Sequence, residues 1–96
     1  MKATSKTNSK ALKDLYEAVL NLETVDECKK FFRDLCTLSE LNSMSERLQV
    51  MKMIDQKVPY REISKKTGAS TATITRIAHW LHHGKGGYKL VLERMS

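Results

Sequence analysis

The sequence predicts an all-α protein, and three observations support this fold class. Apolar residues recur at intervals of three and four along most of the 96 residues, as they do on one face of an α-helix. The chain contains one proline, Pro59, so few positions interrupt such helices. Residues 59–83 divide at Gly68 into two short helical segments, which is the spacing of a helix-turn-helix.

The chain length predicts one domain, residues 9–96, preceded by an arm, residues 1–8. The arm is polar and has no apolar periodicity, so we expect it to be flexible. It is interpreted as a solvated tail, with a contact to a nucleic acid as the alternative. Ser9 is placed to cap the first helix. The apolar face of that helix consists of Leu12, Leu15, Tyr16, Val19 and Leu22.

Two capping boxes predict where the second and third helices begin. In each box a threonine is followed three residues later by a glutamate, Thr24 by Glu27 and Thr37 by Glu40, so that their side chains satisfy free backbone N–H groups. The third helix continues to about Gln56. The second helix would bury Cys28, Phe31, Phe32, Leu35 and Cys36. The third carries a stripe of Leu41, Met44, Leu48, Met51 and Ile54.

The first three helices carry more apolar surface than a monomer of 96 residues is able to cover. We therefore expect a homodimer in which residues 9–56 form the shared dimerisation core. The alternative is a monomeric helix bundle that packs the same residues inside one chain.

Residues 59–83 are the predicted helix-turn-helix, and residues 88–95 form a short last helix. Pro59 cannot continue the third helix but fits the first turn of the next one. Gly68 permits the positive φ that the turn between the two helices requires. The apolar anchors of the motif are Ile63, Ile74 and Ile77. The last helix would direct inward Tyr88, Val91, Leu92 and Met95.

The positive charge is concentrated in the half of the chain that carries this motif. Residues 1–56 contain nine Lys and Arg against nine Asp and Glu, whereas residues 57–96 contain eight against two, which gives the formal net charge of +6. A basic surface suits a DNA phosphate backbone, although basic composition alone also fits RNA or an anionic membrane. Small hydroxyls, a methyl group and an arginine at the start of the second helix suit close approach to base edges in a major groove. The candidate DNA-binding residues there are Ser70, Thr71, Ala72, Thr73, Thr75 and Arg76.

Other classes of function find little support in the sequence. No stretch has the roughly 20 apolar residues that span a membrane, and the polar start does not match a secretory signal. Cys28 and Cys36 lie about 12 Å apart along one helix, so we expect reduced thiols in a cytoplasmic protein. No nucleophile with a base, no metal site and no cofactor site stands out, so an enzyme is not expected. Histidines near a helix C-terminus, here His79, His82 and His83, are interpreted as surface residues.

The segment GASTATITR, residues 68–76, resembles the Trp repressor superfamily, and residues 11–94 resemble its YerC/YecD group of bacterial Trp-repressor-like proteins. The stretches that carry the resemblance are DLYEAVLNLETVDECKKFFRDLCTLSEL, MSERLQVMKMID, YREISKKTGASTATITRIAHWL and GGYKLVLER. The resemblance implies six helices, an intertwined homodimer and binding to a palindromic operator.

The same resemblance assigns roles to further residues. Arg61 would contact a phosphate or a base, and charge and location add Lys65, with Lys66 less well placed. Members that bind tryptophan hold it between two arginines, whose positions are occupied here by Arg47 and Arg76. The glycine and serine that make room for that ligand are replaced by Ile77 and Trp80, so we expect a filled pocket and no tryptophan corepressor. Regulation by another small molecule stays open.

Together these observations predict a transcriptional regulator, specifically a repressor, that binds double-stranded DNA in a sequence-specific manner. The alternative is a helix-turn-helix that serves as a protein-interaction module or an adaptor of another regulator.

Overall fold

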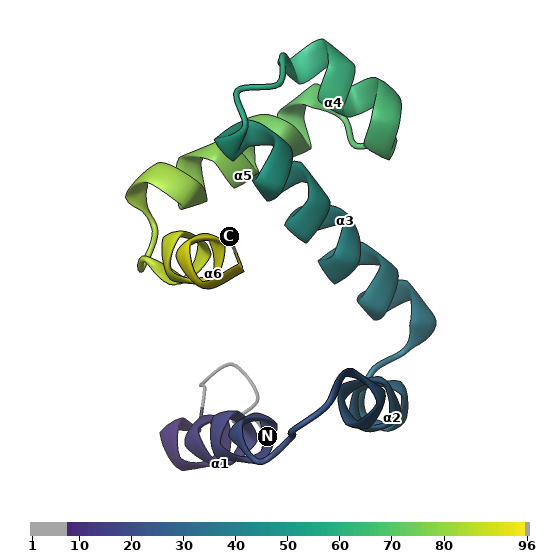
Figure 1. Cartoon of the computed structure of the whole chain (residues 1–96), viewed down its shortest axis with the longest axis vertical. Coiled ribbons are helices and arrows are strands. Elements are labelled where there is room, and N and C mark those ends of the chain that lie inside the picture. The colour runs from purple at the N-terminus through teal and green to yellow at the C-terminus, as the bar shows by residue number, and fades with distance from the viewer. Residues whose placement is uncertain (1–7, 96) are drawn as a thin grey trace. The chain divides into compact units, whose positions relative to one another are not determined.

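The computed structural model describes residues 8–95, and these residues form six α-helices and no strand (Figure 1). The all-α prediction is therefore confirmed. The predicted arm falls, apart from Asn8, outside the described residues. The helices are α1 Ser9–Leu20, α2 Val25–Leu35, α3 Leu38–Asp55, α4 Tyr60–Thr67, α5 Thr71–His83 and α6 Gly87–Met95.

Capping side chains fix the starts of α1 and α2, with two corrections to the expected caps. Asn8 rather than Ser9 caps α1, because the Asn8 Oδ1 accepts from the Ala11 N–H at 3.1 Å. Thr24 caps α2 as predicted, and its Oγ1 accepts from the Glu27 N–H at 3.1 Å. The Glu27 carboxylate accepts from the N–H of Glu23 at 2.7 Å, not from that of Thr24, so the box closes one residue earlier than expected.

The chain divides into two compact units, Met1–Leu38 and Ser39–Ser96. The second unit contains all the buried apolar residues among those described, and they form one cluster in the C-terminal half of α3, in α4 and α5 and in the turn between these two helices. Helix α5 packs against both α4 and α6. The cluster consists of Val50, Met51, Ile54, Ile63, Ala69, Ile74, Ile77, Ala78 and Leu81.

The apolar faces predicted for α1 and α2 are not buried within the first unit. No residue of either helix is buried, and Phe31 and Phe32 are half-buried, with their rings in edge contact at 5.6 Å between centroids. Tyr16 and Leu35 are more than half exposed. The first unit thus has an amphipathic sequence pattern without a closed core of its own.

Helix α6 also differs from the sequence prediction. Tyr88 and Leu92 are half-buried and pack against the core cluster, as expected. Val91 and Met95 are exposed, so the contact of α6 with the core is confined to a narrower face than the expected one. In the described residues no helix is long and apolar enough to cross a membrane.

The junction between α3 and α4 places a lysine in a conformation that favours glycine. Lys57 has φ of 66°, the one positive φ of a non-glycine residue in the described chain. Its N–H donates to the Ile54 carbonyl at 3.0 Å, and the N–H of Val58 donates to the Met53 carbonyl at 3.0 Å, so the helix ends in a Schellman motif.

We expect Lys57→Gly to raise the free energy of unfolding by about 1 kcal/mol, since glycine removes the cost of a left-handed side-chain-bearing residue. The opposite substitution is Gly68→Ala, where φ is 81° and an added Cβ meets no atom within 4 Å. It should lower stability by about the same amount. Urea unfolding of both variants measures the two changes, and equal stability of Lys57→Gly and the wild type would contradict the first.

Candidate nucleic-acid interface

The turn between α4 and α5 is held by three side-chain hydrogen bonds as well as by Gly68. The Ser64 hydroxyl donates to the Ala69 carbonyl at 2.7 Å. The Thr67 hydroxyl donates to the Ile63 carbonyl at 2.8 Å and accepts from the Ala69 N–H at 3.1 Å. The sequence analysis missed this role of Ser64 and Thr67. The sequence signal for this role is the pair of hydroxyl residues near the end of the helix, because Ser and Thr side chains can form hydrogen bonds with nearby backbone groups.

The predicted anchors Ile63, Ile74 and Ile77 are buried, and the first two are fully buried. They lie in one cluster with Met51 of α3. The angle between α4 and α5 is therefore set by close-packed side chains rather than by the turn alone.

The first turn of α5 presents a short row of small side chains. The Ser70 Oγ accepts from the Thr73 N–H at 3.1 Å and lies 3.0 Å from the Thr73 Oγ1, so these two hydroxyls are engaged with each other and with the helix cap. Thr71, Ala72 and Thr75 are exposed, whereas Thr73 is half-buried. Thr71 and Thr75 are four residues apart and share one face of the helix. This face is free to meet another molecule.

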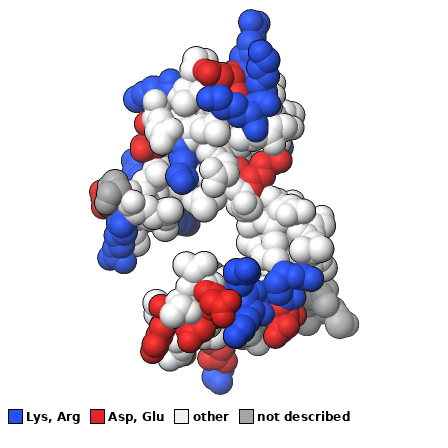
Figure 2. Space-filling view, turned by 45° about the vertical axis from the view of Figure 1, so that its right-hand side comes forward, with Lys and Arg blue, Asp and Glu red and all other residues white. Residues whose placement is uncertain are grey.

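Cations of α4 lie on the same unit as this face. Figure 2 shows Lys and Arg side chains gathered over the part of the second unit that α4 forms in Figure 1, with a smaller acidic group beside them. Lys66 is paired with Glu62, its Nζ 3.7 Å from the carboxylate Oε2. Arg61 and Lys65 are exposed, and no ion pair involves either of them within residues 8–95. Their charges are therefore available to an anionic partner.

Arg47 and Arg76 line one cleft of about 360 Å³ between α3, α5 and α6. Ile77 lies at its buried side, as expected. Trp80 also lines the cleft, but its side chain is 53% exposed. The indole thus lies at the edge of this cleft, and the filled pocket stays a prediction. The sequence analysis did not foresee the other lining residues, which are Ser43, Glu46, Thr73 and Tyr88.

The chain is similar in sequence to proteins of a known family. The family model of the Trp repressor protein matches residues 10–96. The uncharacterized protein YerC of Bacillus subtilis (strain 168) is 40% identical over 91 residues, which cover 95% of this chain and 88% of that protein. It is a relative of similar size, since each chain is covered over most of its length.

Two crystal structures are similar over nearly the whole chain. A TrpR-like protein from Eubacterium eligens superposes with a TM-score of 0.87 at 42% identity, covering 98% of this chain and 95% of that one. A candidate Trp repressor from Staphylococcus aureus gives a TM-score of 0.86 at 45% identity, covering 99% and 94%. Both similarities include the six helices and the turn described above. The chain belongs to the Trp repressor family.

Proposed function

We propose that this protein is a sequence-specific double-stranded DNA-binding regulator, a repressor, that reads its operator with the first turns of α5. Membership of a family of helix-turn-helix regulators, rather than enzymes, supports the general role. The observation that carries the proposal is the exposed face of Thr71, Ala72 and Thr75 at the start of α5. It lies in the same unit as Arg61 and Lys65, which are exposed and take part in no ion pair within residues 8–95. Such a role requires access to the chromosome and hence a cytoplasmic location in a bacterium.

The candidate residues fall into two groups by their chemistry. Arg61, Lys65 and Arg76 would neutralise phosphates and release counterions, which supplies affinity for any DNA sequence. Thr71, Ala72 and Thr75 would supply base preference through methyl contacts to thymine and water-bridged hydrogen bonds. Ser70 and Thr73 remain at the interface, but their mutual hydrogen bond gives them a positioning role in the first turn.

The operator should be palindromic because we propose a homodimer. Its two copies of α5 would enter successive major grooves on one face of the duplex, about 34–36 Å apart as in other helix-turn-helix dimers. The support for a dimer is the exposed apolar surface of α1 and α2, which one chain leaves uncovered. A second copy of the same chain would cover it.

Selection from a random pool of DNA duplexes tests the function directly. We expect enrichment of one palindromic motif whose half-sites are about one helical turn apart. Recovery of random sequences only, together with capture of a defined protein partner, would support the alternative of an interaction module instead.

Two substitutions should separate affinity from base preference. Thr75→Ala should change the preferred base at one position of each half-site, with a loss of about 1–3 kcal/mol on the selected operator and little loss on random DNA. Lys65→Ala should weaken binding to both DNAs alike. Gel-shift titrations on the two DNAs measure this, and equal effects of both variants on operator and random DNA would contradict the division of roles.

We further propose that tryptophan is not the corepressor. In tryptophan-binding members a glycine and a serine leave room for the ligand, and here Ile77 and Trp80 stand at those positions beside Arg47 and Arg76. We expect no heat of binding in isothermal titration with tryptophan at micromolar concentrations and unchanged DNA affinity. Micromolar binding that strengthens operator affinity would overturn this. Ile77 and Trp80 give this cleft a different shape from one lined by glycine and serine, and the same titration with a metabolite panel would detect a different small effector.

A further inference from the structure

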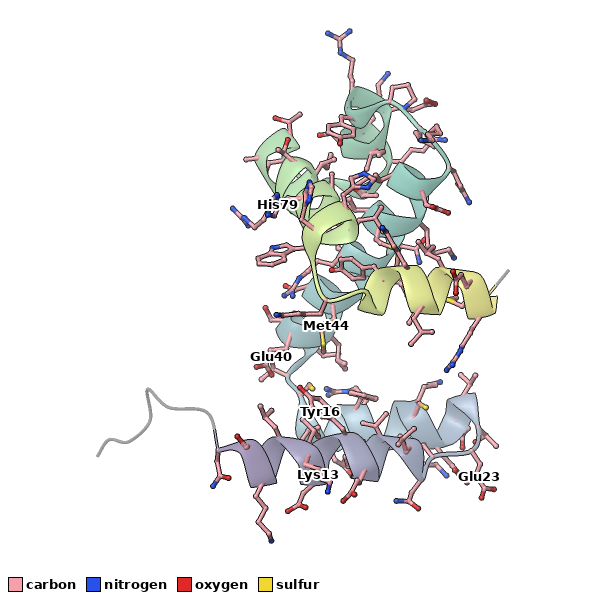
Figure 3. The ribbon with its side chains drawn as sticks, turned by 90° about the vertical axis from the view of Figure 1, so that its left-hand side faces the viewer. Lys13, Tyr16, Glu23, Glu40, Met44 and His79 are labelled. Carbon is pink, nitrogen blue, oxygen red and sulfur yellow. The ribbon has the colours of Figure 1, made fainter. Side chains whose placement is uncertain are left out.

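The last two turns of α5 carry an exposed pair of histidine rings. His79 and His83 are four residues apart, so their side chains share one face of the helix. Their ring centroids are 5.0 Å apart and the ring planes meet at 41°. Figure 3 labels His79 on α5, and both residues are exposed. No contact with another element of the described chain buries the pair.

This separation matches that of two imidazoles bound to one metal ion. A metal–nitrogen bond of about 2.0–2.1 Å places each ring centroid about 3.2 Å from the ion. Two such rings with an angle of about 90–110° at the ion have centroids about 4.5–5.2 Å apart. The observed 5.0 Å lies within this interval, so the backbone of α5 already sets the spacing that a chelate needs.

We propose that His79 and His83 form a two-histidine site for a divalent transition metal ion of the Zn²⁺, Ni²⁺ or Cu²⁺ class, with water completing the coordination. Imidazole nitrogens suit these ions, whereas Ca²⁺ and Mg²⁺ require oxygen ligands that the pair does not offer. The site uses two protein ligands. No third His, Cys, Asp or Glu among the described residues joins the pair to form a larger metal-holding group.

The third histidine is not part of the site. His82 is one residue before His83 and lies about 100° away around the helix, and its ring centroid is 6.4 Å from that of His83. It has the same chemistry, the same exposure and nearly the same place in the chain. His82 is therefore a matched control for the pair.

A bound ion would link two successive turns at the C-terminal end of α5. A cation there is favoured by the helix dipole, and the link would oppose fraying of the turn that precedes Gly84 and α6. The sequence alone favoured surface histidines without a ligand role, because spacing along the chain does not give the distance between the rings. The site goes beyond the proposed function and does not depend on dimerisation or on DNA.

The single tryptophan of the chain reports on the site. The centroid of the Trp80 indole is 5.5 Å from that of the His79 ring, close enough for a bound Cu²⁺ ion to quench its fluorescence. We would titrate Cu²⁺ into the full-length, untagged protein. The expected result is saturable quenching at one ion per chain, reversed by a chelator and unaffected by Mg²⁺.

Variants then assign the ligands. His79→Ala and His83→Ala should each raise the Cu²⁺ concentration for half-quenching at least tenfold, while His82→Ala leaves it within twofold. Equal midpoints in all four proteins, or an equal shift in His82→Ala, would overturn the proposal. Circular dichroism should show unchanged helix content, since all three residues are exposed. If an alanine variant loses helix content, His79→Gln and His83→Gln are used in its place in the same comparison.

Discussion

Phe32→Asp should separate the proposed dimer into monomers and abolish operator binding. Phe32 lies on the apolar face of α2, which is only half covered within one chain. In a dimer that covers this face, each copy would bury an unpaired carboxylate, at a cost of about 3–5 kcal/mol per charge. Because both copies carry the substitution, the dissociation constant of the dimer should rise by several orders of magnitude. Sedimentation equilibrium measures this change.

Lys29→Asp is the control for added negative charge on the same helix. Lys29 is exposed and lies outside the apolar face, so the variant should remain dimeric at the same protein concentrations. The Trp80 fluorescence of the second unit should show whether its core persists in Phe32→Asp. A wild-type chain that sediments as a monomer while binding its operator would contradict both the dimer and the palindromic operator.

Operator affinity should fall on the order of a thousandfold when salt rises from about 50 to about 200 mM. If three cations of each copy, Arg61, Lys65 and Arg76, neutralise phosphates, a dimer releases about six counterions, and the plot of log K against log salt has a slope of about −5. Fluorescence anisotropy of labelled operator at several salt concentrations gives this slope.

Removing one of these cations should change the slope by a defined amount. Lys65→Ala should reduce its magnitude by about 2 for a dimer, one counterion from each copy. Lys66→Ala is the matched control, since Lys66 is already paired with Glu62 and should contribute less. A slope near zero for the wild type would mean that phosphate contacts do not drive the binding.

Much of the fold was predictable because its signals are local. Thr24 and Ser70 cap helices through hydrogen bonds to residues three positions along the chain, and Gly68 supplies a positive φ. Each of these helix boundaries is therefore specified by residues next to it. The buried isoleucines of the helix-turn-helix follow from their periodicity. The errors arose where neighbouring residues have similar propensities. Asn8 and Ser9 are both good caps, and only the backbone conformation decides between them.

The parts of the site that the sequence did not predict depend on packing between distant segments. The cleft forms where α3, α5 and α6 meet, so neither the openness beside Trp80 nor the presence of Glu46 follows from local pattern. The pairing of Lys66 with Glu62 depends on side-chain conformation, although the spacing of four residues permits it. The burial of the α1 and α2 faces cannot be settled by periodicity, because an amphipathic helix does not specify which molecule covers it.

The hydrogen-bonded pair of Ser70 and Thr73 affects the thermodynamics of recognition. Their hydroxyls are ordered before DNA arrives, and the flanking threonines, Thr71 and Thr75, are β-branched and have restricted χ1 rotation. Little side-chain entropy is therefore lost when this surface meets a groove. Discrimination between operators should appear mainly in the lifetime of the complex, since the rate of formation varies little among related complexes.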